Sequence, residues 1–290
     1  MTNIANFLNT TARFSQVFSF SGNAFKQFTL ITIVLTGLGF KLSAQLVQSP
    51  VFSHSSGFYS EEFNLEIVAE NSNDMILYTL DGSAPKIENL TGKEWKYKLN
   101  YKTNFEDDHG QLISDTIWTR EYFNPLFIKD ISSESDKIAD ISTSYMTNDS
   151  YYDKSKALET PVYKGICLRV VAYRNGLYSE EVTKNYFIGD VNDYSIPIVC
   201  LAIEPNQFYG FEDGINVPGI DYENWRIQNP QVSLDSYQDI FAAPGNFRRK
   251  GISTESKINF SYLVEGNEVL NHGAGIRING NTSRYYPNRS

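Results

Sequence analysis

The chain has 290 residues, more than one average domain, and its content of 41% apolar and 14% aromatic residues excludes disorder throughout. Its formal charge of −9, with Glu61 as the first acidic residue, argues against nucleic acid as a partner because phosphate backbones are repelled. The 19 glycines and 10 prolines, together with many aromatic and β-branched residues, favour strands and turns over long helices.

An apolar run at residues 28–40 follows Lys26 and contains no acidic residue. The run is shorter than the roughly 20 apolar residues of a membrane-spanning helix, and it has the length of the apolar core of a secretory signal. Ser43 and Ala44 provide small residues for cleavage after position 44. We therefore predict a signal peptide over residues 1–44, with no membrane span in the mature chain; an uncleaved anchor or a buried strand is the alternative. The mature protein is then secreted, periplasmic or on the surface of a bacterial cell.

The cysteines and histidines indicate no metal site. Cys167 and Cys200 lie within apolar runs, where a buried thiol behaves as a small hydrophobe, so two free cysteines are favoured over the disulfide that export would permit. The histidines are isolated in the sequence, with no metal-ligand spacing.

Short strands separated by turns are predicted after the signal peptide. Residues 63–67 alternate apolar with polar, and residues 76–80 form an apolar run that ends at an Asp-Gly-Ser turn, so a hairpin is the simplest interpretation. Residues 166–173 and 182–187 form two further runs on either side of Asn175-Gly176, a strong hairpin signal. Repeated short strands without a helical period predict a β-sandwich.

Several of these segments resemble a known family. They are residues 57–59, 78–85 (Tyr-Thr-Leu-Asp-Gly-Ser-Ala-Pro), 122–128, 168–173 and 186–187. They look like the β-sandwich module appended to chitobiases, β-hexosaminidases and family 29 fucosidases. The resemblance implies an immunoglobulin/fibronectin-like sandwich over residues 45–190, with insertions near 86–121 and 132–158. It also implies a non-catalytic accessory role, because the hydrolase in that family is a separate domain.

The first insertion contains the candidate carbohydrate contacts Trp95 and Trp118, since flat aromatic faces can stack on sugars. The alternative is that its aromatic residues form a small satellite core on the sandwich. Asp81 in the Asp-Gly-Ser turn is predicted to shape the turn through its own backbone rather than to act in catalysis. No catalytic residue is assigned, because the sequence fixes no second carboxylate near Asp81, as glycoside hydrolysis requires.

Residues 191–290 open with a continuous apolar run at 196–203, which predicts a strand buried on both faces. Residues 206–244 are rich in Gly, Pro, Asn and Tyr and are predicted to be loop. Alternation at residues 258–264, a Gly-Asn turn and an apolar stretch at 269–278 then predict return strands.

This second region is similar to the start of the spore-coat CotH family, which has an atypical protein-kinase-like fold. The matching residues are 196–202, 211–217, 246–250 and above all 275–284 (Gly-Ile-Arg-Ile-Asn-Gly-Asn-Thr-Ser-Arg). The resemblance implies that residues 191–290 are the β-rich N-terminal part of a kinase-like α+β domain, an intact copy of which would use ATP and a divalent metal. Arg277 and Arg284 are candidate nucleotide contacts, because a guanidinium suits phosphate oxygens; the alternative is that both arginines face solvent.

Together these patterns predict a mainly β protein: a sandwich followed by an incomplete kinase-like domain. The expected function is that of an exported bacterial surface protein, in which a binding module precedes a CotH-like region without a complete active site or a cofactor of its own. Its partner would be a polysaccharide or a cell-surface protein. The alternative is a stand-alone carbohydrate-binding or adhesion module.

Overall fold

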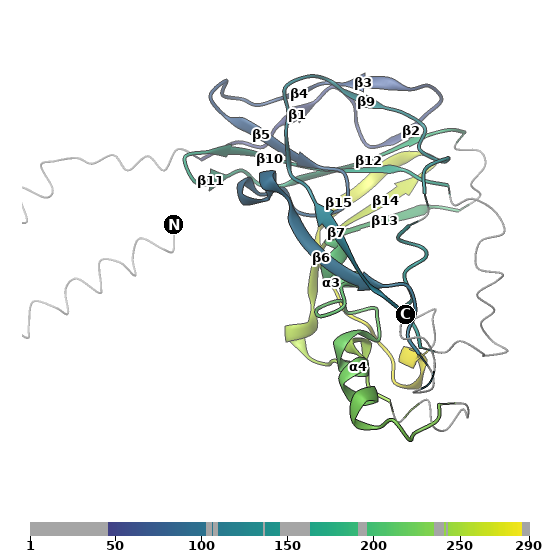
Figure 1. Ribbon diagram of the computed structural model, residues 1–290. Coiled ribbons are helices and arrows are strands. Elements are labelled where there is room, and N and C mark those ends of the chain that lie inside the picture. Colours follow the sequence, from purple (N-terminus) through teal and green to yellow (C-terminus); the bar gives the residue numbers. More distant parts are fainter. Residues whose placement is uncertain are drawn as a thin grey trace, which may run out of the picture. The chain divides into compact units, whose positions relative to one another are not determined.

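The computed structural model describes residues 46–102, 106, 110–135, 137–145, 163–190, 196–234, 241 and 243–285 (Figure 1). The predicted signal peptide, residues 1–44, lies outside the described residues, as does much of the predicted insertion at 132–158. From Leu46 onward the chain forms one compact unit.

Strands dominate the described residues, which confirms the prediction of a mainly β protein. The strands are β1 (Val51–Phe52), β2 (Gly57–Tyr59), β3 (Phe63–Leu65), β4 (Ile67–Val68), β5 (Met75–Thr79), β6 (Lys93–Lys98), β7 (Leu112–Ile117), β8 (Arg120–Glu121), β9 (Leu126–Ile128), β10 (Ile166–Arg174), β11 (Leu177–Tyr178), β12 (Val182–Ile188), β13 (Ile198–Ile203), β14 (Ser256–Val264) and β15 (Asn267–Ile276). The α-helices are α3 (Pro205–Tyr209) and α4 (Gly219–Gln228), and short 3₁₀ turns lie at Ile87–Thr91, Asn246–Arg248, Ile252–Thr254 and Thr282–Tyr285.

The largest sheet has the strand order β13-β14-β15-β2-β12-β10-β5-β8, with β11 paired to β10. All its pairings are antiparallel except β12 with β2. Strands from both predicted regions, 45–190 and 191–290, therefore belong to one sheet. The two regions join through a short pairing of β15 with β2, at Asn267 and Gly57.

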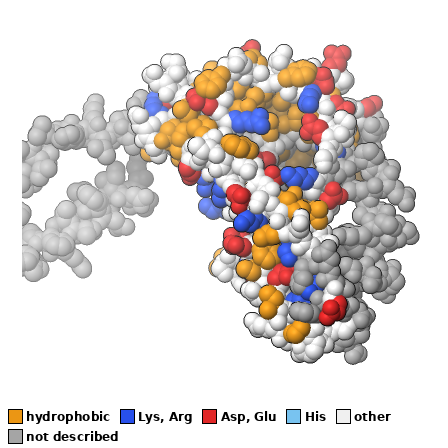
Figure 2. All heavy atoms as spheres, viewed as in Figure 1, with side chains coloured by type: hydrophobic (Ala, Val, Ile, Leu, Met, Phe, Trp, Pro, Cys, Tyr) orange, Lys and Arg blue, Asp and Glu red, His pale blue; other side chains and the backbone are white. Residues whose placement is uncertain are grey.

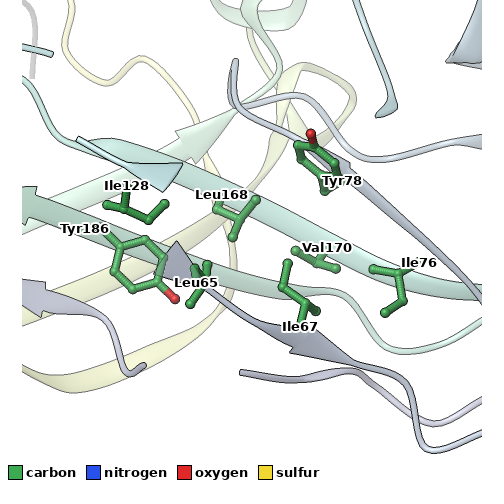
Figure 3. Close-up of a cluster of buried hydrophobic side chains, with 8 residues drawn as sticks. All are labelled: Leu65, Ile67, Ile76, Tyr78, Ile128, Leu168, Val170 and Tyr186. Carbon is green, nitrogen blue, oxygen red and sulfur yellow. The ribbon is translucent and has the colours of Figure 1, made fainter. Parts of the chain in front are cut away.

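One face of this sheet is covered by two strand pairs, β1 with β4 and β3 with β9. Residues 63–67 alternate as predicted, so that Leu65 and Ile67 point inward while Glu66 is exposed. Leu65 and Ile67 pack with side chains from β5, β9, β10 and β12 (Figure 3). The buried core cluster consists of Leu65, Ile67, Ile76, Tyr78, Ile128, Leu168, Val170 and Tyr186.

The turn signals have mixed outcomes. Asn175 and Gly176 both have positive φ, at 52° and 84°, and connect β10 to β11 as the Asn-Gly pair predicts. Glu265 and Gly266 likewise join β14 to β15, with φ of 49° and 76°. The expected hairpin between residues 63–67 and 76–80 is wrong, because β3 and β4 pair with β9 and β1, and β5 pairs with β10 and β8.

The sheet curls, so that β13 and β14 face β10 and β12. The Asn185 side-chain amide on β12 donates to Ser261 Oγ on β14 at 3.0 Å, although these strands are three positions apart in the sheet order. In a flat sheet, three spacings of about 4.8 Å would put these side chains out of reach. The backbone oxygen of Ile203 also approaches Gly82 beyond the end of β5. The curl creates a second interior on the other side of the sheet.

Two sequence predictions for residues 191–290 are wrong. The strand at 196–203 is not buried on both faces: β13 is an edge strand, and Val199 and Leu201 are 52% and 45% exposed. The segment 206–244 is not simply loop, since it contains most of α3 and all of α4. Part of the Gly and Pro content that suggested a loop stands at the start of α4, where Pro218 and Gly219 begin the helix.

No helix among the described residues is long and apolar enough to cross a membrane. On the face shown in Figure 2, acidic and basic side chains are interspersed among hydrophobic ones.

Candidate functional site

A pocket of about 560 Å³ is built on the first predicted insertion. The insertion forms an antiparallel hairpin of β6 and β7, in which Trp95 lies opposite Asp115. Along β6 the exposed Glu94 and Lys96 alternate with the buried Trp95 and Tyr97, so one face of the hairpin is apolar. The pocket volume is within the range of small-ligand sites, about 300 to 1,000 Å³.

Aromatic side chains form one wall of this pocket. The rings of Trp95 and Tyr97 stack with centroids 4.9 Å apart and an interplanar angle of 30°. Both pack with Ile117, Ile141 and Val217, so the hairpin is pinned against the region after α3. Tyr209 of α3 also lines the pocket, and burial raises its pKa above the ordinary tyrosine value.

Charged groups line the pocket beside these rings. Lys137 Nζ donates to Asp115 Oδ2 at 2.5 Å, and this hydrogen bond raises the pKa of Lys137. Asp115 Oδ1 accepts from the backbone amide of Thr116 at 2.9 Å. Lys164 lines the same pocket and donates to the carbonyl of Ser132 at 3.0 Å. A carboxylate and ammonium groups beside aromatic rings can recognise a polar ligand with an apolar face.

Asp81 also lines the pocket and shapes its turn as predicted. Its Oδ1 accepts from the Ser83 backbone amide at 2.9 Å and from the Ser83 hydroxyl, and its Oδ2 accepts from the Trp118 amide at 3.4 Å. The fold thus brings Asp115 into the pocket of Asp81, which the sequence did not indicate because 34 positions separate them and no motif joins them. Both carboxylates accept hydrogen bonds through both oxygens, an arrangement that suits binding better than proton donation.

The two predicted carbohydrate contacts have different surroundings. Trp95 is only 7% exposed and lies in the core of the β6–β7 hairpin, with part of its side chain on the pocket wall. Trp118 is 47% exposed, follows β7 directly and packs on Gly92. The hydrogen bond from the Trp118 backbone amide to Asp81 places Trp118 beside the pocket, although Trp118 does not line it.

The two predicted nucleotide contacts lie elsewhere. Arg277 follows β15 and its Nε is 3.3 Å from Glu255 Oε2. Arg284 donates to the backbone carbonyls of Gly280, Arg249 and Phe247 at 2.7, 3.1 and 3.3 Å. Arg284 therefore ties the Thr282–Tyr285 turn to the turn at Asn246–Arg248. Neither arginine lines the pocket.

Both cysteines are free and partly exposed. Burial is the main cause that raises the thiol pKa of Cys167 to about 12 and that of Cys200 to about 11. Within the described ranges no group of three or more His, Cys, Asp or Glu side chains could hold a metal ion. His109 is outside those ranges.

A buried ion pair that the sequence did not signal holds the insertion in place. Lys98 at the end of β6 and Glu223 on α4 are both buried, and Lys98 Nζ lies 5.8 Å from the ring centroid of Tyr101. Tyr101 and Tyr222 belong to a second buried cluster with Tyr145, Leu234, Ala243 and Phe247. The first insertion therefore packs on the region after residue 205, far from it in sequence.

No protein-family model matches this chain, and no match is found among the curated proteins or the solved structures.

Proposed function

We propose that this chain is an exported bacterial cell-surface protein that binds a glycan without hydrolysing it. Support for export comes from the apolar run at residues 28–40 and the small residues before position 45. Support for a binding module comes from the resemblance of residues 57–187 to the accessory β-sandwich of chitobiases. The packing of side chains from β3, β4 and β9 on one face of β5, β10 and β12 is compatible with such a sandwich.

The observation that carries the proposal is the pocket wall on which the Asp115–Lys137 pair stands beside Trp95 and Tyr97. Sugars present hydroxyl groups around an apolar ring face. A carboxylate and an ammonium can bond the hydroxyls, and aromatic side chains can cover the apolar face. Trp118 adds an exposed ring next to this pocket.

The same residues support binding rather than hydrolysis. A glycosidase needs one carboxyl group that gives a proton and a second that acts as base or nucleophile. Asp81 is engaged by its turn and Asp115 by Lys137 and Thr116. Each acid is thus held as an acceptor.

A glycan array with residues 45–290 tests the proposal. The whole span is needed because the β6–β7 hairpin packs on residues after 205. We expect binding to at least one bacterial or plant polysaccharide at millimolar concentration or below, with at least tenfold loss in Asp115→Ala. Glu134→Ala is the matched control, since it breaks the exposed Lys129–Glu134 pair outside the pocket. No binding to any glycan, or equal losses in both variants, would refute the proposal.

A second candidate function concerns residues 191–290, which we propose to be the start of a CotH-like, kinase-like domain. One observation favours it: Val199, Tyr262 and Leu270 are in register across β13, β14 and β15, and Val199 and Leu270 are exposed apolar side chains. An exposed apolar sheet face is typical of a surface that another segment covers. An intact domain would bind ATP and a divalent metal, with Arg277 and Arg284 as phosphate contacts.

The test of this second candidate is the nucleotide sequence after the codon for Ser290. An in-frame continuation with acidic metal-binding residues would support it. A stop codon at that place, together with no binding of ATP and Mg²⁺ by calorimetry, would exclude an active kinase-like domain.

A further inference from the structure

A second pocket, of about 440 Å³, is lined by residues of β10, β13, β14 and α3. It is bounded by Cys167 of β10, by Leu201 and Ile203 of β13, and by Phe208 of α3. Ile258 of β14 and Ile276 of β15 complete its apolar lining. The raised pKa of the Cys167 thiol reflects the poor hydration of this place.

The apolar pocket adjoins the first pocket, which we call the glycan pocket after its proposed ligand. Five residues line both: Asp81, Ile138, Gly165, Pro205 and Tyr209. Charged side chains other than Asp81 line only the glycan pocket, namely Asp115, Lys137 and Lys164. The two pockets are thus neighbours, and the one without Asp115, Lys137 and Lys164 is the apolar end of the pair.

We infer that the ligand is an amphiphile, a saccharide that carries an acyl or alkyl chain. The sugar would lie against Asp115 and the adjacent aromatic rings, and its alkyl chain would extend past Tyr209 toward Leu201 and Ile258. A bare sugar would leave the apolar end without contact, whereas a chain buried there is removed from water. The inference rests on the proposed function and specifies the class of glycan.

The test measures binding of methyl, hexyl, octyl and decyl β-maltosides below their micelle concentrations. Each buried methylene should strengthen binding by about fourfold, which corresponds to about 0.8 kcal/mol. We expect at least a tenfold gain from methyl to octyl maltoside. Equal affinity for all chain lengths would overturn the inference.

Leu201→Trp and Ile276→Trp fill the apolar end and should abolish the chain-length gain. Two variants are used because either one alone could perturb the strand that carries it. Val199→Trp is the matched control, because Val199 lies on the same strand two residues away, is similarly exposed and does not line the pocket. If Val199→Trp removes the gain as fully as Leu201→Trp, the alkyl chain binds along β13 outside the pocket and the inference is wrong.

The outcomes separate this inference from the proposed function. Glycan binding on the array with no gain from an alkyl chain contradicts only the inference. A chain-length gain that Leu201→Trp abolishes but Asp115→Ala leaves intact supports an apolar site and refutes the glycan headgroup at Asp115, and with it the amphiphile. Absence of binding in both assays refutes both.

Discussion

Lys98 on β6 and Glu223 on α4 form a buried ion pair, with Lys98 Nζ 2.7 Å from Glu223 Oε1. The pair joins a hairpin inserted in the first predicted region to a helix of the second, 125 positions away. Replacing either residue alone removes the opposite charge from a buried ionised side chain, whereas replacing both residues removes both charges.

Lys98→Met should therefore destabilise the protein by about 3–5 kcal/mol, and the double variant Lys98→Met, Glu223→Leu should recover most of that loss. Urea unfolding of the four proteins in the cycle measures the coupling. Lys96→Met is the control, since Lys96 is exposed on the same strand and pairs with the exposed Glu94. Losses that simply add in the double variant would show that the pair is not coupled.

Gly57→Ala should loosen the junction between the two halves of the main sheet. Gly57 has φ of 153°, and an added Cβ would lie 2.6 Å from the backbone oxygen of Gly266. The clash falls on backbone, so the strand must move, and we expect a loss of about 2–4 kcal/mol in thermal or urea unfolding. Gly176→Ala also has a positive φ but meets nothing within 4 Å, and should cost only about 1 kcal/mol. Similar losses in both would contradict the close approach.

The two tryptophans of the insertion should differ sharply in their effect on stability. Trp95→Ala removes a buried side chain and should cost about 3–5 kcal/mol. Trp118→Ala alters a half-exposed side chain and should cost less than about 1 kcal/mol. Differential scanning calorimetry makes the comparison, and glycan binding by the Trp118→Ala protein shows whether this ring contacts the ligand. A large loss of stability in Trp118→Ala would mean that its ring is structural.

Alkaline pH should destabilise the protein through its two free thiols, Cys167 and Cys200. Burial raises the pKa of Cys167 from 9.0 to about 12 and that of Cys200 to about 11. The unfolded thiols release their protons first as pH rises, so this contribution to stability is complete below pH 9 and is lost between about pH 9 and 12. The midpoint of urea unfolding should fall less over pH 9 to 10.5 in Cys167→Ala than in the parent. Parallel profiles would contradict the raised pKa.

The same shift protects Cys167 from alkylation. At pH 8 a thiol with a pKa of 12 is about one part in 10⁴ ionised, against about one part in 10 for a pKa of 9. Iodoacetamide should label Cys167 at least a hundredfold more slowly in the folded protein than in urea, as followed by mass spectrometry. Equally fast labelling in both states would show an accessible, hydrated thiol.

The sequence by itself determined the local structure. Alternation at residues 63–67 fixed which side chains face inward, because successive strand residues point to opposite faces. At residues 258–264 the same signal was misleading, since Ser261 and Leu263 are buried whereas Phe260 and Tyr262 are only partly buried. Asn175-Gly176 and Asp81-Gly82-Ser83 fixed their turns, because these residues tolerate positive φ or bond their own backbone. These signals depend only on near neighbours, so they hold before any tertiary contact forms.

Only the tertiary structure decided which strands pair and which side chains meet. Nothing in residues 63–65 encodes β9 as the partner of β3, and a continuous apolar run cannot reveal that β13 is an edge strand. The site depends on such long-range choices: Asp81, Asp115, Lys137 and Tyr209 come from four separate segments. These residues come together because the sheet curls and the β6–β7 hairpin packs to bury an apolar surface. Such packing involves residues far apart in the sequence, so a local sequence pattern does not predict it.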